Sequence, residues 1–366
     1  MLVQMGYSAP FLGSAFGFFL LISLPIAVLG LFRARNFRSI MKLFITKAFF
    51  FFLIIYTLFV VIQYINGTEF EFISYHLKSV FRLAAFYFVT LNLYFGGVFK
   101  DVRYSIVVLC LAAFFVLSSI FNIIKIFPAE FGGEYFELDY QMLAFLVLFF
   151  FIGNLANSRT KSNIVIICAM VVFLFHLGAR TEFYIALALL GAVEFLKAKR
   201  RIGVLILFFF GSVFFALIAH IYLDVNWLRD VRIFSVIFSD ADPSKISRSE
   251  LTFNALKTIA EHPFLGNFAS HELGAYSHNL LSAWVDFGVF GFFYVLFLVA
   301  IPLFIILLNI RNNLNQIYIL AVSSLMALVI AYALAKTYNY SMLAVALAYY
   351  GIWVSTEKGR LNNEKK

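Results

Sequence analysis

Long apolar runs recur along the whole chain and constrain its fold more than any other feature of the sequence. Of the 366 residues, 63% are hydrophobic and 13% are charged, whereas a soluble domain carries roughly twice that share of charge. An apolar run of about 20 residues can cross the hydrocarbon core of a bilayer as one helix. Because a backbone in lipid must satisfy its own polar groups, these runs predict a polytopic helical membrane protein.

Eleven runs can be placed, so we expect an all-α membrane bundle of about eleven transmembrane helices. They lie at about 11–32, 48–65, 83–99, 104–124, 141–157, 164–179, 182–196, 202–223, 288–309, 316–335 and 338–355. Eight helices then fall in 1–223 and three in 278–357, separated by one long external loop at 224–277 and followed by a tail at 358–366. We expect short amphipathic helices in the loop and a single integral membrane domain overall.

The charged residues indicate the orientation of the bundle. With the N-terminus outside, the loops predicted to lie inside carry 18 of the 28 Lys and Arg residues. Short cytoplasmic loops carry such an excess in membrane proteins, so we expect the N-terminus outside and the C-terminus inside. The formal net charge of +9 is spread over many short loops, which indicates topology and not a nucleic-acid partner.

Arg180 interrupts an almost continuous apolar stretch at 164–196. One helix over this stretch would leave the arginine near the middle of the bilayer, at a cost of about 3 kcal/mol or more. Two short helices joined at Gly178–Thr181 would put it at the outer mouth of the bundle, as the loop assignment requires. Arg180 is therefore a candidate anion-binding residue, with an arginine that merely reaches toward the interface as the alternative.

The long loop contains a helix signal around Arg248. Ser247-Arg248-Ser249-Glu250 has the spacing of a capping box, and apolar residues follow at helical spacing until His262-Pro263. We expect Arg248 to begin an amphipathic helix on the membrane surface, where free N–H groups and a guanidinium attract phosphate. A solvated arginine on an ordinary cap is the alternative.

His278-Asn279 opens the next apolar stretch, and Gly288-x-x-Gly291 follows. We expect a short helix at 278–287, a bend near Gly288 and then the ninth span. His278 would then lie at the same outer mouth as Arg180 and is a candidate base, with a structural histidine as the alternative. Three further cations at predicted outer ends of spans either anchor the interface or join an anion site: Lys78, Arg82 and Lys336.

A metal site is a competing interpretation of the histidines. His262, His271 and His278, with Glu261 or Glu272, would be the ligands. Their spacings match no common zinc pattern, so we expect neither a metal nor another cofactor.

In their order, spacing and sidedness, these pieces resemble the superfamily of O-antigen polymerases and O-antigen ligases, which are membrane glycosyltransferases. The pieces cover roughly 176–295 and are Gly178-Ala-Arg-Thr, the external loop with Arg248, His262-Pro-Phe-Leu-Gly266, and His278-Asn with Gly288-x-x-Gly291. The chain departs from the family at Ala179, where serine is frequent, and at Asn267-Phe268, where a second glycine is frequent.

The resemblance implies a GT-C-like bundle in the bacterial inner membrane, with its active site at the periplasmic face. It implies transfer of a sugar chain from undecaprenyl diphosphate to an acceptor hydroxyl. Arg180 and Arg248 would stabilise the diphosphate leaving group, and His278 would accept the proton. Asn279, Lys78, Arg82 and Lys336 would contribute to substrate binding. The sequence suggests no paired carboxylates for a covalent intermediate, so we expect a one-step, inverting and metal-independent reaction.

Several functions fit this resemblance. A polymerase would use the next undecaprenyl-diphosphate-linked repeat unit as acceptor, and an external loop of about 50 residues, short for a ligase, favours this function. A ligase would use lipid A–core, and a third member type glycosylates protein. A flippase for lipid-linked sugars is the alternative from another class, but such transporters usually carry internal repeats, which this sequence lacks. Membrane lipids and a chain-length regulator are the further expected partners.

Overall fold

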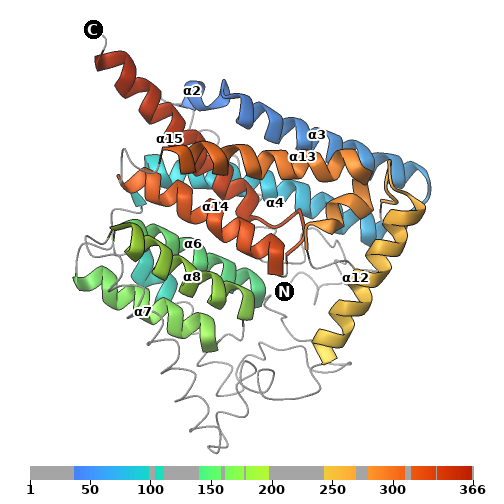
Figure 1. Cartoon of the computed structure of the whole chain (residues 1–366), viewed down its shortest axis with the longest axis horizontal. Helices are drawn as coiled ribbons and strands as arrows, with labels where there is room; N and C mark the ends of the chain where they lie inside the picture. The colour runs from blue at the N-terminus through green and yellow to red at the C-terminus, as the bar shows by residue number, and fades with distance from the viewer. Residues whose placement is uncertain are drawn as a thin grey trace, which may run out of the picture. The chain divides into compact units, whose positions relative to one another are not determined.

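The structure, a computed structural model, is helical throughout the part of the chain that it describes. The described residues are 37–98, 104–110, 140–157, 161–176, 179–197, 243–268, 279–309, 315–334 and 336–364. They contain helices and turns but no strand (Figure 1), which confirms the predicted all-α class. The predicted spans at 11–32 and 202–223, and most of the one at 104–124, lie outside these residues.

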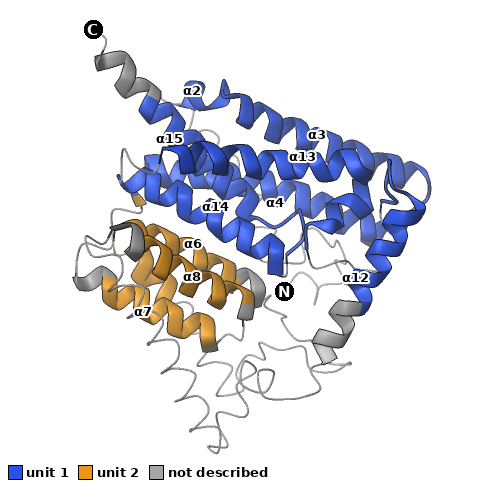
Figure 2. Ribbon diagram, viewed as in Figure 1, with its two compact units in different colours: residues 1–97, 244–366 blue, residues 98–243 orange. Residues whose placement is uncertain are grey.

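The chain divides into two compact units, Met1–Gly97 with Ser244–Lys366 as unit 1 and Val98–Pro243 as unit 2 (Figure 2). In unit 1 the described helices are α2 (Phe37–Met41), α3 (Phe44–Ile65), α4 (Phe70–Phe95), α12 (Pro243–Glu261), α13 (Leu281–Leu308), α14 (Gln316–Leu334) and α15 (Met342–Glu364). In unit 2 they are α6 (Tyr140–Ala156), α7 (Lys161–His176) and α8 (Arg180–Lys197).

Three of the described helices are long and apolar enough to cross a membrane, namely α3, α13 and α14. Shorter apolar helices at Leu143–Ala156, Ile164–Phe175 and Thr181–Val193 coincide with three further predicted runs. The membrane character of the chain therefore has structural support, while the total of eleven spans stays a prediction.

Two predicted boundaries are wrong. The helix α4 begins at Phe70, 13 residues before the predicted third span, because Ile73, His76 and Ser79 continue the buried face of the later turns. The last helix begins at Met342, later than the predicted span, and runs to Glu364 through most of the predicted tail.

The centre of unit 1 is the packing of α15 against both α14 and α4. Small side chains lie at this contact, and alanines on both helices are fully buried, among them Ala321, Ala327, Ala344 and Ala348. In a bilayer, small residues let helix backbones approach closely, and the resulting van der Waals contact replaces the hydrophobic effect as the driving force.

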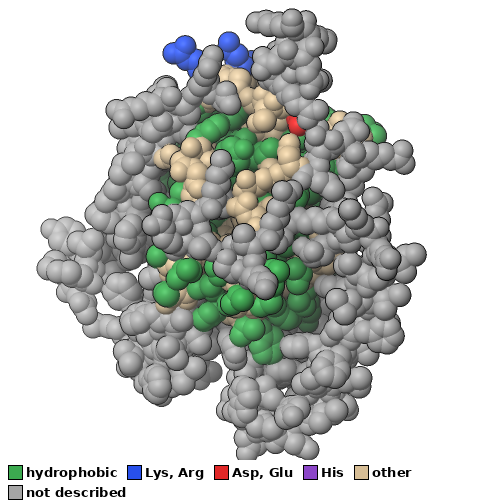
Figure 3. Space-filling view, turned by 90° about the vertical axis from the view of Figure 1, so that its left-hand side faces the viewer, with side chains coloured by type: hydrophobic (Ala, Val, Ile, Leu, Met, Phe, Trp, Pro, Cys, Tyr) green, Lys and Arg blue, Asp and Glu red, His purple; other side chains and the backbone are tan. Residues whose placement is uncertain are grey.

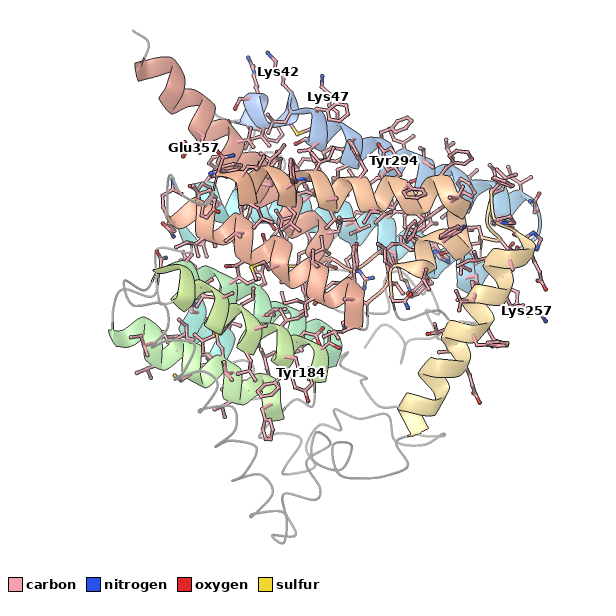
Figure 4. All side chains as sticks on the ribbon, viewed as in Figure 1. Lys42, Lys47, Tyr184, Lys257, Tyr294 and Glu357 are labelled. Atoms are coloured by element: carbon pink, nitrogen blue, oxygen red, sulfur yellow. The ribbon has the colours of Figure 1, made fainter. Side chains whose placement is uncertain are left out.

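The long helices α3, α4, α13, α14 and α15 of unit 1 lie along a common direction, so their ends fall at two ends of the unit (Figure 1). At the first, named here the α2 end, Ser39 is hydrogen-bonded to Ser355, and Asn315 Nδ2 lies 3.5 Å from Glu357 Oε1. Lys42 and Lys47 project from this end (Figure 4). Described Lys and Arg side chains also gather at one edge when the molecule is viewed from the left of Figure 1 (Figure 3). The basic segment with Lys42 and Lys47 and the C-terminal part of α15 are both predicted to lie inside, and they share the α2 end.

The second end is named here the Tyr338 end and contains the predicted bend in α13. Gly288 has φ of 69° and ψ of −170°, a combination that essentially only glycine adopts. The predicted short helix, bend and span are therefore confirmed over the described residues. The turn after α12 packs directly on the bend, since a Cβ on Gly288 would lie 2.0 Å from the Phe264 carbonyl oxygen.

This turn also satisfies the backbone groups that the bend leaves open. In a continuous helix, the Val289 N–H would donate to the Val285 carbonyl oxygen. Here the Val289 N–H donates to the Pro263 carbonyl oxygen at 2.9 Å, and the Val285 carbonyl accepts from the Asn267 N–H at 2.6 Å. The Trp284 indole donates to the same Pro263 oxygen at 2.9 Å. Both halves of the broken helical hydrogen bond thus find new partners in one turn.

The bend predicts a difference between two glycine substitutions. Gly288→Ala would combine a forbidden backbone conformation with a backbone clash, and we expect it to lower the free energy of unfolding by more than about 3 kcal/mol. Gly67 is the control, because it also has positive φ, at 82°, but has open space around it; its alanine variant should lose only about 1 kcal/mol. Thermal unfolding of the purified variants in detergent compares them, and equal losses would contradict the proposed contact.

Candidate functional site

The short helix before Gly288 has a polar face at the Tyr338 end. Asn279, Ser282 and Asp286 are spaced by three and four residues, so they lie along one side of this helix. Asn279 Oδ1 accepts a hydrogen bond from the Leu281 N–H at 2.9 Å, and Ser282 Oγ donates to the Asn279 carbonyl at 2.8 Å. Asn279 thus fixes the start of the helix, directly after the predicted base.

The connection between α14 and α15 packs against this face. The Tyr338 hydroxyl donates to Asp286 Oδ2 at 2.7 Å, and the Tyr338 N–H donates to Ser282 Oγ at 3.3 Å. Burial, and then the negative charge of Asp286, raise the pKa of Tyr338 well above its ordinary value. The phenol therefore stays protonated and remains the donor to the carboxylate.

The helix α4 completes what we name the polar cluster, formed by Asn279, Ser282, Asp286, Tyr338, Asn339 and Ser79. Asn339 Nδ2 donates to Ser79 Oγ at 3.2 Å, and Ser79 lies on α4 between Lys78 and Arg82. The Arg82 Nε is buried and has no hydrogen-bond partner among the described residues. Lys336 belongs to the connection that carries Asn339, and its Nζ lies 5.2 Å from the centre of the Tyr340 ring.

Four of the predicted substrate-binding residues therefore come together at one end of unit 1, on segments that contact one another through the polar cluster. They are Asn279, Lys78, Arg82 and Lys336. The interpretation of Lys78, Arg82 and Lys336 as an anion site stays a prediction.

An aromatic cluster supports the polar cluster from within the unit; it consists of Tyr56, His76, Phe268, Phe287 and Tyr338. The Phe287 ring lies 5.1 Å from that of Tyr338 and 5.4 Å from that of Phe268. The Tyr56 hydroxyl lies 2.8 Å from His76 Nδ1. Because these side chains are nearly fully buried, they hold α3, α4, the Phe268 turn and the short helix in fixed positions.

The predicted catalytic arginines begin or lie within helices of different units. The structure ends α7 at His176 and begins α8 at Arg180, which confirms that two helices and not one cover this stretch. Arg180 is thus the first residue of α8, in unit 2. His278 lies outside the described residues, immediately before Asn279.

The expected position of Arg248 is wrong. The helix α12 begins at Pro243, so Arg248 is its sixth residue and not its first. Proline favours the first turn of a helix, because its missing N–H would have no helical partner there, and this signal overrides the capping-box pattern. The predicted end at His262-Pro263 is confirmed, since α12 ends at Glu261.

Sequence reasoning missed three residues of interest. Asp286 and Tyr338 form the central hydrogen bond of the polar cluster, and Glu182 is 2% exposed in the first turn of α8. An acidic residue inside an apolar run is itself a functional signal, and it could have identified Asp286 and Glu182. No comparable signal identifies Tyr338, because its role depends on a partner 52 residues away.

The alternative metal site receives no ligand set from the described residues. Among them, no group of three His, Cys, Asp or Glu side chains comes together. His262 is exposed in the turn after α12, while His271, Glu272 and His278 lie outside the described part of the chain.

Comparison of the chain with models of protein families, with curated proteins and with solved structures finds no match. The candidate site is therefore defined by its own chemistry: a half-buried carboxylate bonded to a buried phenol, amide and hydroxyl groups, and three cationic residues on the segments that carry them.

The Tyr338–Asp286 hydrogen bond predicts a specific pattern of stability changes. Tyr338→Phe would leave a half-buried carboxylate without its donor, and we expect a loss of about 1–3 kcal/mol in the free energy of unfolding. Tyr64→Phe is the control, because Tyr64 is 61% exposed; its loss should stay within about 0.5 kcal/mol.

A double-mutant cycle with Asp286→Ala isolates the pair. If the bond exists, the double variant should lose less stability than the sum of the two single losses. Strictly additive losses would contradict the assigned hydrogen bond.

Proposed function

We propose that this chain is an O-antigen or other surface-polysaccharide polymerase. It would transfer the growing glycan from undecaprenyl diphosphate to the next lipid-linked repeat unit. The observation that carries the proposal is the gathering of Asn279, Lys78, Arg82 and Lys336 at the Tyr338 end, next to the position that the family resemblance assigns to the base. This end is where the predicted topology puts the periplasm.

The proposed reaction forms one glycosidic bond and breaks one bond to phosphate. The oxygen of an acceptor sugar hydroxyl attacks the anomeric carbon of the donor, and undecaprenyl diphosphate leaves from the opposite side. His278 accepts the proton of the attacking hydroxyl, because histidine is the side chain that most often acts as a general base. Arg180 and Arg248 offset the charge that develops on the leaving diphosphate. The configuration at the anomeric carbon is inverted in this single step.

The cations of the Tyr338 end would bind the substrate diphosphates. Lys78 and Arg82 lie one helical turn apart on α4, and a guanidinium can offer paired donors to a phosphate group. Asn279 and the remaining polar cluster offer the amide and hydroxyl groups that recognise sugar hydroxyls. The same site, used with lipid A–core as acceptor, would make the chain a ligase.

The proposal includes the full architecture expected from the sequence. It takes the chain as a GT-C-like bundle of eleven spans in the bacterial inner membrane, with a periplasmic N-terminus and a cytoplasmic C-terminus. Two observations support this orientation. The segment with Lys42 and Lys47 lies at the α2 end together with the C-terminal part of α15, and the polar cluster lies at the opposite end.

Lipopolysaccharide from a strain lacking the gene tests the function. We expect core bearing a single repeat unit and no ladder, because repeats can still be ligated but not joined. Wild-type complementation should restore the ladder, and Arg180→Ala or His278→Ala should not. Bare core with polymer on the lipid carrier would show a ligase. An unchanged ladder would contradict both functions and leave transport or another polysaccharide pathway.

Bidentate recognition predicts a graded effect at Arg180. Arg180→Lys keeps the charge but loses the planar pair of donors. Loss of a whole oxyanion donor lowers kcat about 10²–10³-fold, so we expect this smaller change to lower kcat by at least about tenfold. Arg38→Lys at the exposed α2 end is the matched control and should leave kcat unchanged. Full activity of Arg180→Lys would contradict bidentate recognition.

A further inference from the structure

The helix α12 has three distinct faces in its described turns, Glu250–Glu261. One face includes Ala255, which is fully buried within the protein. The other two faces are exposed, and they differ in chemistry. The sequence pattern predicts one amphipathic helix with apolar residues at helical spacing, namely Leu251, Ala255, Leu256, Ile259 and Ala260. Of these, Ala255 is buried, whereas Leu256 and Ala260 are exposed.

The first exposed face is an apolar stripe, formed by Phe253, Leu256 and Ala260 and continued by Phe264 and Leu265 in the turn. Phe253 is 68% exposed and Leu265 is 76% exposed. The spacing of three and four residues places the helical members on one side of α12. Large apolar side chains with this exposure, gathered on one surface, mark an interaction site.

The second exposed face is a polar stripe with the same helical spacing, formed by Glu250, Asn254, Lys257 and Glu261. Lys257 projects from α12 into the surroundings (Figure 4). The two stripes lie side by side along the helix, so α12 presents protein, apolar and polar faces in turn around its circumference. Such an arrangement matches a helix with protein on one side, lipid on the second and water on the third.

The apolar stripe continues the surface that a bilayer would cover. The exposed side chains of α13 follow helical spacing from its bend onward, with Phe290 at 71% and Phe293 at 57% exposure. The Phe264 backbone contacts Gly288 at the start of this span. In Figure 1, α12 also runs steeply across the direction of α13. A helix that crosses the end of a span in this way lies along the membrane plane.

We propose that the apolar stripe inserts into the boundary between lipid headgroups and acyl chains, so that α12 and its turn form an interfacial membrane anchor. The anchor fixes the depth of the Pro263 carbonyl, which receives hydrogen bonds from Trp284 and Val289. The short helix and the polar cluster are thereby held at the level of the headgroups. This inference needs only a membrane location and is independent of the proposed reaction.

Depth-dependent quenching tests the anchor. In a background with Cys110→Ser and Cys168→Ser, single cysteines replace Leu256 or Leu265 in the apolar stripe, and Asn254 or Lys257 in the polar stripe. Each full-length variant is labelled with a small fluorophore and reconstituted in phosphatidylcholine–phosphatidylglycerol vesicles. Lipid with a nitroxide high on the acyl chain probes the interface, and iodide probes water.

An apolar helix face in an interface lies roughly 5–10 Å deep, so the nitroxide lipid should quench the Leu256 and Leu265 labels at least about twofold more than iodide does. The Asn254 and Lys257 labels should show the reverse. Labels of both stripes quenched alike by iodide would overturn the proposal. Protection of the apolar stripe from both quenchers would also overturn it, since a protein surface would then cover the stripe.

A second measurement leaves the stripe unchanged. In Trp227→Phe with Trp353→Phe, the remaining Trp284 lies against the turn through its bond to Pro263. Lipids brominated high on the acyl chain should quench its emission more than lipids brominated near the chain end. Equal or absent quenching would contradict the anchor even if labelled variants misfold.

Discussion

One broken helical hydrogen bond organises the Tyr338 end of unit 1. Where the Val289 N–H would have donated to the Val285 carbonyl, the turn after α12 supplies a new partner to each group. Irregular backbone at the edge of a membrane is costly unless other protein groups satisfy it. The glycine at 288 permits the bend, and the close approach of the Phe264 backbone requires that no side chain be present there.

The bend has consequences on both sides of the turn. On one side it redirects the chain into a short helix whose polar face contacts the α14–α15 connection, and this connection contacts α4 through Asn339 and Ser79. On the other side it ties α12 to the first turn of a membrane span. The proposed site for a lipid-linked substrate would require both, because its polar groups must lie near the diphosphate while its position is fixed relative to the bilayer. Three hydrogen bonds of Pro263 and Asn267 connect the turn after α12 to both the short helix and the span.

Features with a local cause could be predicted from the sequence. Glycine at 288 and the charged interruption at Arg180 each mark a break in an apolar run, and the structure contains both breaks. The all-α class follows from the apolar runs themselves. The beginning of α4 could not be predicted from hydropathy, because residues 70–82 are helical through packing of their buried face and not through apolar composition.

The candidate site could be predicted only in part, for a related reason. Cations and the polar residue after His278 are visible as exceptions in an apolar sequence, but their common location depends on pairs such as Ser79 with Asn339, 260 residues apart. Tyr338 resembles many other tyrosines of this chain until Asp286 is placed beside it. The start of α12 was predicted wrongly from a local pattern. The capping box at Ser247–Glu250 predicts a helix start at Arg248, but the helix begins five residues earlier at Pro243.

The central claim is that the Tyr338 end serves the transfer of a glycan from a lipid diphosphate. The most direct measurement uses the purified full-length chain in vesicles with an undecaprenyl-diphosphate-linked repeat oligosaccharide as the only substrate, followed by mass spectrometry of glycan and lipid. The claim predicts glycans that lengthen by whole repeats, with one undecaprenyl diphosphate released for each new bond. Oligosaccharide that stays unchanged while it moves between leaflets would contradict it.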